Sequence, residues 1–412
     1  MDLTEARSAL EPSRFLARQP ILNGRREIVG YELLFRSGWE NSFSGDLDEA
    51  TRKTLDNYLS MDIESLVDGR LVFINCAREA LVGKLMTLLP PETTVLEVLE
   101  TVEPDDEVMA ACRELCARGY RIALDDFVPT PEKQPLVEIA SYVKVDFRLS
   151  DAEARREIQR MTKHSSAALL AEKLEDQGEF EVARAEGFKY FQGYFFCRPK
   201  IVAGREIPPN QLNYLRLLAE LTRATLNIRE VVSIVQLEAS LCYRLLRLAN
   251  SALWGVRKHI TSVHEALMLV GEKRFRLLVS VAATSVLGQN QPAALISLSL
   301  ERARFCELVA PLVGENSTEQ FMLGLLSLLD AMLETPMEQI SRSLPLRKEA
   351  EEALLGSTNH VSVPLCLIRG FESGIWGACS SKAREFGVSD EMLTKLYLDS
   401  VRWAIESVAA SR

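Results

Sequence analysis

The sequence predicts an α/β domain followed by an all-α domain, with the α/β part closed as a TIM-like (β/α)8 barrel. Two observations carry this prediction. Up to about residue 200, short runs rich in β-branched and aromatic residues alternate with helical stretches, as in parallel strands joined by crossover helices. From residue 211 onward the pattern is helical almost without a break, and no convincing period-two segment follows.

The first domain contains eight candidate strands. Their ranges are 15–22, 28–35, 71–76, 94–98, 121–127, 142–147, 168–174 and 190–196. Helical periodicity occupies the intervals at 48–60, 79–89, 106–119, 151–165 and 178–187. Eight strands within about two hundred residues suit a compact barrel of this kind.

The two domains are separated by the segment RPKIVAGREIPPN. Regular structure is interrupted in it by Pro199, Gly204, Pro208 and Pro209. We therefore place the barrel at 13–203 and the helical domain at 204–412. Within the helical part, Ser262 and Glu265 have the spacing of a capping box, which predicts the start of a helix.

The composition narrows the classes of function. The 412-residue chain carries a formal net charge of -10, which argues against broad electrostatic binding to DNA or anionic lipid. Nucleic acid and membrane are therefore not expected as partners. No stretch approaches the roughly 20 apolar residues that span a bilayer, and the N-terminus lacks the apolar core of a signal peptide. We expect a cytoplasmic protein.

Polar residues close the apolar runs of the predicted barrel. They are Glu32, Asn75, Glu97, Asp125, Asp126, Lys144, Asp146, Glu172, Glu175 and Gln192. Chemistry in such barrels is assembled at the C-terminal ends of the strands, and buried carboxylates are costly unless they are paired or hold metal. Several oxygen ligands could hold two hard divalent cations and activate water for attack on a phosphodiester. For any single acid, a helix cap or an ion pair with Arg explains the residue equally well.

The order and context of these residues resemble the EAL family of cyclic di-GMP phosphodiesterases, over roughly 15–199. The signature Glu-Ala-Leu-x-Arg of that family corresponds to 32–36, with Leu33 where Ala is usual. The resemblance implies cyclic di-GMP as ligand and a site for two Mg²⁺ or Mn²⁺ ions. By the same resemblance, the metal-binding positions are Glu32, Asn75, Glu97, Asp125, Asp126 and Glu172, with Gln192 in the outer metal shell.

The resemblance also assigns the remaining roles. Lys144 matches the residue that orients the attacking water, and it stands with Glu172 as a catalytic position. Arg36 matches a contact to the substrate phosphate. Asp146 and Glu175 match supporting positions, and Glu175 is the one that anchors a flexible loop at the active site.

Two departures from the family pattern bear on activity. After Asp126 and Phe127 the family has a loop rich in Gly and Ser, whereas this chain reads VPTPEKQPL at 128–136. Prolines fix φ and lack an N–H donor, so this loop cannot replace one built on glycine. Lys173 stands where the family has Gly. We expect hydrolysis to be feeble or absent while metal or nucleotide affinity persists, and an active phosphodiesterase is the alternative.

The helical part resembles the HDOD domain, so that the whole chain looks like a bacterial EAL–HDOD fusion signalling protein. The match covers most of 211–387 and is carried by Ala249, Asn250, Ser251, Ser262, Ala266, Val270 and Gly271. None of the four histidines precedes an Asp, so we expect no catalytic metal in this domain. The resemblance implies regulation through a protein partner. The sequence leaves the oligomeric state open, a homodimer included.

Overall fold

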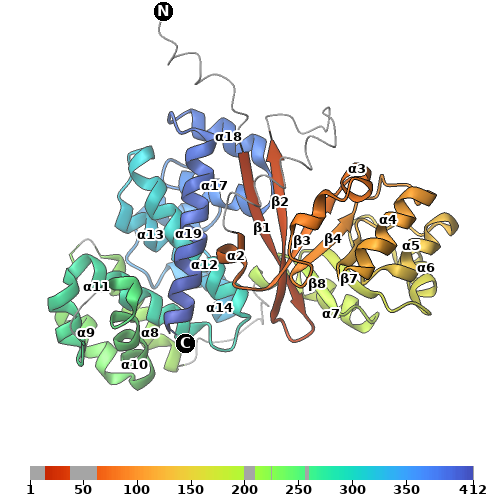
Figure 1. Ribbon diagram of the computed structural model, residues 1–412. Coiled ribbons are helices and arrows are strands. Elements are labelled where there is room, and N and C mark those ends of the chain that lie inside the picture. Colours follow the sequence, from red (N-terminus) through yellow and green to blue (C-terminus); the bar gives the residue numbers. More distant parts are fainter. Residues whose placement is uncertain (1–13, 38–62, 199–208, 224, 256–258, 412) are drawn as a thin grey trace, which may run out of the picture. The chain divides into compact units, whose positions relative to one another are not determined.

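The computed structural model describes residues 14–37, 63–198, 209–223, 225–255 and 259–411 (Figure 1). Contacts divide the chain into two compact units. One comprises Met1–Phe195 and Gly370–Thr394, and the other Phe196–Arg369 and Lys395–Arg412. The predicted junction between 203 and 204 and the predicted helix at 48–60 lie outside the described residues.

The first unit contains a closed barrel whose strands follow one another in sequence order, which confirms the predicted fold class. The strands are β1 (Arg14–Asn23), β2 (Ile28–Ser37), β3 (Leu71–Cys76), β4 (Thr94–Val98), β5 (Arg121–Leu124), β6 (Tyr142–Asp146), β7 (Ala168–Leu174) and β8 (Tyr190–Gly193). Strands β2 to β8 run parallel to one another, whereas β1 is antiparallel to both of its neighbours, β2 and β8. Only residues 24–27 separate β1 from β2, too few for the crossover that a parallel pair requires.

Helices alternate with the strands of this unit (Figure 1). They are α2 (Ile63–Val67), α3 (Arg78–Val82), η1 (Leu85–Leu88), α4 (Asp106–Ala117), η2 (Pro131–Lys133), α5 (Gln134–Ile139), α6 (Ala152–Thr162), α7 (Gln177–Ala185), η3 (Phe195–Cys197), which runs on past the unit's end, and α18 (Trp376–Arg384). The starts of α4, α6 and α7 are fixed by Asp105, Asp151 and Asp176, whose side chains accept hydrogen bonds from backbone N–H groups of the first turn.

The interior of the barrel is filled rather than open. A cluster of buried side chains occupies it, formed by Ile21, Phe73, Val95, Ala123, Tyr142 and Leu170. The rings of Phe73 and Tyr142 lie 5.2 Å apart. Since this apolar layer closes the interior, the polar side chains gather towards the ends at which β2 to β8 finish.

The second unit is helical, and the structure describes no strand in it. Its helices are α8 (Pro209–Thr222), α9 (Ile228–Leu237), α10 (Ala239–Ala249), η4 (Ala252–Trp254), α11 (Val263–Leu287), α12 (Ala293–Val309), η5 (Ala310–Val313), α13 (Ser317–Leu326), α14 (Leu329–Leu333), α15 (Met337–Ser341), α16 (Lys348–Leu354), α17 (Val363–Glu372) and α19 (Asp390–Ser411). By their ranges, α17 and α19 each run from one unit into the other.

The predicted capping box begins α11. Ser262 Oγ accepts a hydrogen bond from the Glu265 N–H at 3.1 Å, as expected for an N-cap. The reciprocal bond differs from the prediction, because the Glu265 carboxylate accepts from the N–H of Thr261 at 2.9 Å. Gly271, with φ 78°, interrupts the helical backbone inside α11.

Residues 370–394 belong to the unit that contains the barrel, although the sequence reading assigned all of 204–412 to the helical domain. The main-chain oxygen of Glu372 accepts hydrogen bonds from Gln19 Nε2 at 3.1 Å and from the Tyr194 hydroxyl. Gln19 lies on β1 and Tyr194 follows β8, so this segment is hydrogen-bonded to both ends of the sheet where the barrel closes.

Among the helices that the structure describes, none combines the length and the apolar character needed to span a membrane.

Candidate functional site

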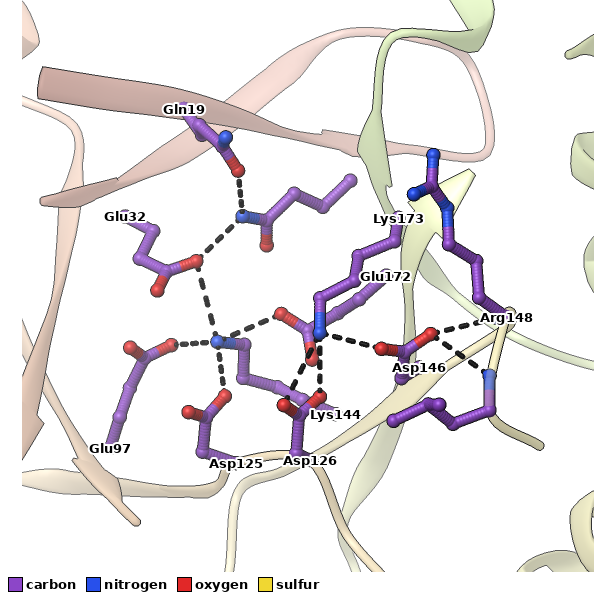
Figure 2. A network of polar contacts seen from close by, with 12 residues as sticks. Gln19, Glu32, Glu97, Asp125, Asp126, Lys144, Asp146, Arg148, Glu172 and Lys173 are labelled. Atoms are coloured by element: carbon purple, nitrogen blue, oxygen red, sulfur yellow. Dashed lines mark hydrogen bonds and ion pairs between the residues drawn. The ribbon is translucent and has the colours of Figure 1, made fainter. Parts of the chain in front are cut away.

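Lys144, on β6, is fully buried at the centre of a group of carboxylates (Figure 2). Its Nζ lies 2.7 Å from Glu97 Oε1, 2.7 Å from Asp125 Oδ1, 2.9 Å from Glu172 Oε1 and 3.4 Å from Glu32 Oε2. Glu32 lies on β2 and Glu97 on β4. Asp125 directly follows β5, and Glu172 lies on β7. Four of the predicted metal-binding side chains therefore meet at one ammonium.

The charges of this group do not balance, because a single ammonium faces four carboxylates. Burial raises the pKa of Glu97 well above its usual value, with a further contribution from Glu32. Burial also raises the pKa of Glu172 to about 8. For Lys144, burial lowers the pKa, but the surrounding carboxylates outweigh it and hold the pKa well above the ordinary value. The group can accommodate more positive charge than Lys144 supplies.

Several buried oxygens of this group lack a hydrogen-bond partner among the described residues. They are Asn75 Oδ1, Glu97 Oε2, Glu172 Oε2 and Gln192 Oε1. Asn75 and Glu97 are directly paired in the register of β3 and β4. Carboxylate and amide oxygens are the donors that Mg²⁺ and Mn²⁺ prefer, so the donor set fits such a cation.

The acids are nevertheless not arranged as a finished metal cage. Among the described residues, no three His, Cys, Asp or Glu side chains form a group that could hold a metal ion as they stand. The carboxylates point at the Lys144 ammonium instead (Figure 2). A metal ion would have to share or take over contacts that Lys144 makes.

Gln192, from β8, fixes Glu32 in place. Its Nε2 donates to Glu32 Oε2 at 2.6 Å and to Gln19 Oε1 at 3.0 Å. Gln19 and Glu32 are opposite each other in the β1–β2 register. Sequence reasoning missed Gln19, although a polar residue inside the apolar run of a strand was a usable signal.

Asp126 is not among the contacts of Lys144. Its carboxylate instead lies 3.2 Å from the Nζ of Lys173, which also lies 2.5 Å from Asp146 Oδ2. The other oxygen of Asp146 accepts the N–H groups of Arg148 at 2.7 Å and Leu149 at 3.2 Å. The adjacent Asp125 and Asp126 are thus held by two different lysines.

Two predicted site residues remain, Glu175 and Arg36. The Glu175 carboxylate forms an ion pair with Arg148, in the turn after β6, and its N–H donates to Glu179 Oε2 at 2.6 Å. The side chain of Arg36, the predicted phosphate contact, lies outside the described residues.

The proline-containing segment after Asp126 folds into the short helices η2 and α5. Pro131 begins η2 and Pro135 lies in the first turn of α5, positions where a missing N–H leaves no helical hydrogen bond unmade. Lys133 Nζ donates to the Glu100 main-chain oxygen at 3.3 Å, and the Phe127 N–H donates to that of Lys144 at 3.0 Å. These two helices are not among the helical ranges that the sequence pattern predicts.

Comparison with known proteins identifies the family. A model of the EAL domain matches residues 44–199, and a model of the HDOD domain matches residues 207–359. The chain is 34% identical over 397 residues to the cyclic di-GMP phosphodiesterase CdgJ of Vibrio cholerae, covering 95% of this chain and 92% of that protein. This chain belongs to the EAL–HDOD family. It is also 34% identical over 400 residues to the uncharacterized protein YuxH of Bacillus subtilis, covering 94% of this chain and 97% of that protein.

Solved structures of EAL proteins also resemble parts of this EAL–HDOD chain. One is the Bacillus subtilis YkuI protein in complex with its substrate cyclic di-GMP and calcium, at 19% identity and TM-score 0.38, covering 69% of this chain and 75% of that one. Another is Klebsiella pneumoniae BlrP1 with manganese and cyclic di-GMP, at 21% identity and TM-score 0.37, covering 45% of this chain and 55% of that one.

Proposed function

We propose that the EAL barrel binds cyclic di-GMP together with a divalent cation, Mg²⁺ or Mn²⁺, and hydrolyses the nucleotide feebly or not at all. The observation that supports this proposal is the ammonium of Lys173, which stands where the family has Gly and lies 3.2 Å from the carboxylate of Asp126. Catalysis requires charges placed for the transition state, and this tethered ammonium already compensates one of the acids that would place them.

The roles proposed for the individual residues follow from this arrangement. The cation ligands are Glu32, Asn75, Glu97, Asp125, Asp126 and Glu172, and a bound divalent cation would polarise a phosphate and a water molecule. Lys144 orients that water, with Glu172 beside it. Arg36 contacts the phosphate. Gln192 positions Glu32, while Asp146 and Glu175 support the turns after β6 and β7.

For the whole chain, we propose a cytoplasmic protein of the cyclic di-GMP signalling network. The HDOD domain engages a protein partner and binds no catalytic metal. The proposal is supported by the family to which the chain belongs. Size-exclusion chromatography with light scattering determines whether the chain is also a homodimer.

A calorimetric titration with cyclic di-GMP, with and without Mn²⁺, tests the barrel's role. We expect binding that depends on Mn²⁺, and chromatography of the reaction should show little or no linear dinucleotide. Little product is expected because a loss of about 4 kcal/mol of transition-state stabilisation would already slow turnover roughly a thousandfold. Glu32→Ala should abolish the Mn²⁺-dependent binding, whereas the exposed Glu64→Ala, on α2, should not. Absence of nucleotide binding by the wild type would refute the proposal.

The alternative is a working cyclic di-GMP phosphodiesterase. It is favoured by the likeness to CdgJ, which extends over nearly the full length of both proteins. Robust turnover in Mg²⁺ or Mn²⁺ that Glu32→Ala abolishes would establish this alternative.

A further inference from the structure

Lys173 occupies a position that a regular strand would not give it. Successive side chains of a strand point to opposite faces, yet Glu172 contacts Lys144 at 2.9 Å while Lys173 reaches Asp146 at 2.5 Å within the same polar group (Figure 2). The register of β7 with β8 shifts between Ala171 and Leu174, which marks an irregularity at these two residues. The irregularity turns both side chains towards the site.

The backbone at Lys173 is in a conformation that favours glycine. Its φ is 58°, in the left-handed region that residues with a Cβ rarely adopt. Asp126, its ion-pair partner, also has a positive φ, of 39°. Backbone strain of this kind persists where the surrounding contacts maintain it, and here both strained residues share one ion pair.

The contacts of Lys173 are those that a cation would make. Its Nζ lies 3.3 and 3.2 Å from the two oxygens of Asp126, and 2.5 Å from Asp146 Oδ2. Asp125, adjacent to Asp126, pairs with Lys144 at 2.7 Å. A divalent ion that bound Asp125 and Asp126 together would have to displace the ammonium of Lys173 from Asp126.

We propose that the Lys173 ammonium acts as a tethered cation in place of a second divalent ion, so that the barrel binds one such ion fewer than its carboxylates could otherwise hold. The inference rests on the proposed function, in that the site takes a divalent cation. A tethered group competes at a high effective concentration, so a free ion must bind strongly to displace it.

Counting bound Mn²⁺ tests the inference without reference to activity. Equilibrium dialysis and the electron paramagnetic resonance signal of free Mn²⁺ give the number of ions bound per chain, for wild type and variants in the full-length protein. Lys173→Gly removes the ammonium and suits the positive φ, whereas Lys173→Met removes the ammonium alone. We expect both variants to bind about one more Mn²⁺ per chain than the wild type, in keeping with a two-cation site.

Two controls define the comparison. Lys173→Arg keeps the positive charge and should bind as many Mn²⁺ ions as the wild type. Lys163→Met removes an exposed lysine at the end of α6 and should also leave the number unchanged. The inference is overturned if neither Lys173→Gly nor Lys173→Met binds more Mn²⁺ than the wild type, or if the wild type already binds two ions. A separate titration with cyclic di-GMP tests the proposed function, and its failure would not alter the Mn²⁺ comparison.

Discussion

The ammonium of Lys144 stands between four carboxylates that would otherwise repel one another. Removing one partner of a buried ion pair leaves the other charge without compensation, which is far more costly than breaking a pair at the surface. The stability of the barrel in the absence of metal should therefore depend on this side chain.

Lys144→Met should lower the free energy of unfolding by about 3–5 kcal/mol when a chelator is present. Adding Mn²⁺ should restore part of this loss, because a divalent cation compensates the same acids. Denaturant unfolding with EDTA and with Mn²⁺ measures both effects. Lys84→Met, which removes an exposed pair with Glu114 at 2.6 Å, serves as control and should cost less than about 1 kcal/mol. Equal losses for the two variants would contradict the prediction.

Single residues also show where sequence reasoning reached its limit. Glu32, Glu97 and Glu172 could be singled out because each interrupts or closes an apolar run. The partner of Asp126 could not be found in this way, since it depends on a backbone irregularity at Lys173 that alternation along a strand does not predict.

At the scale of elements, the strands and the capped helices were the most predictable parts. Apolar runs with clear ends gave the strands, and α4, α6 and α7 begin at aspartates that cap them. The direction of β1 was not recognised, although the four residues between β1 and β2 allow only a hairpin. Helices η2 and α5 were missed because prolines were taken as breaks rather than as helix starts.

Asn250, one of the residues that carry the resemblance to the HDOD domain, stabilises the connection between α10 and α11. Its Nδ2 donates to the main-chain oxygens of Leu246 and Ile260, each at 2.8 Å, and its Oδ1 accepts from the Ile260 N–H at 2.7 Å. One side chain therefore ties the end of α10 to the segment before α11.

Asn250→Ala should destabilise the helical unit by about 2–4 kcal/mol, since each lost hydrogen bond contributes about 1 kcal/mol and both main-chain groups of Ile260 lose the partner that Asn250 supplies. Thermal and denaturant unfolding measure the change. Asn213→Ala is a matched control, because its side chain donates one bond, to Glu238 at 3.1 Å, and it should cost less than about 1 kcal/mol. A loss no greater than that of the control would show that Asn250 has no such role.

At the scale of the whole molecule, the two units are not consecutive pieces of chain. The chain passes from one to the other after Phe195, returns at Gly370 and leaves again after Thr394. The unit that contains the barrel therefore includes a segment more than 170 residues further along the chain. The sequence pattern predicts a single boundary, between 203 and 204, and gives no sign of the two later crossings.

A fragment that ends at residue 206 should accordingly be less stable than the same residues in the full chain. It lacks the main-chain oxygen of Glu372, which accepts hydrogen bonds from Gln19 and Tyr194. Two lost hydrogen bonds amount to about 2 kcal/mol. Hydrogen–deuterium exchange should show faster exchange in β1 and β8 of the fragment, while unchanged protection of both strands would rule the effect out.

The antiparallel direction of β1 has a practical consequence for the handling of this protein. Arg14 pairs with Ser37, so the chain enters the barrel at the end where β2 to β8 finish. An affinity tag or fluorescent protein fused ahead of Arg14 is consequently tethered at the mouth that carries the acidic side chains. Calorimetry of metal or nucleotide should be carried out after such a tag has been cleaved, because a polyhistidine sequence tethered there would itself compete for Mn²⁺.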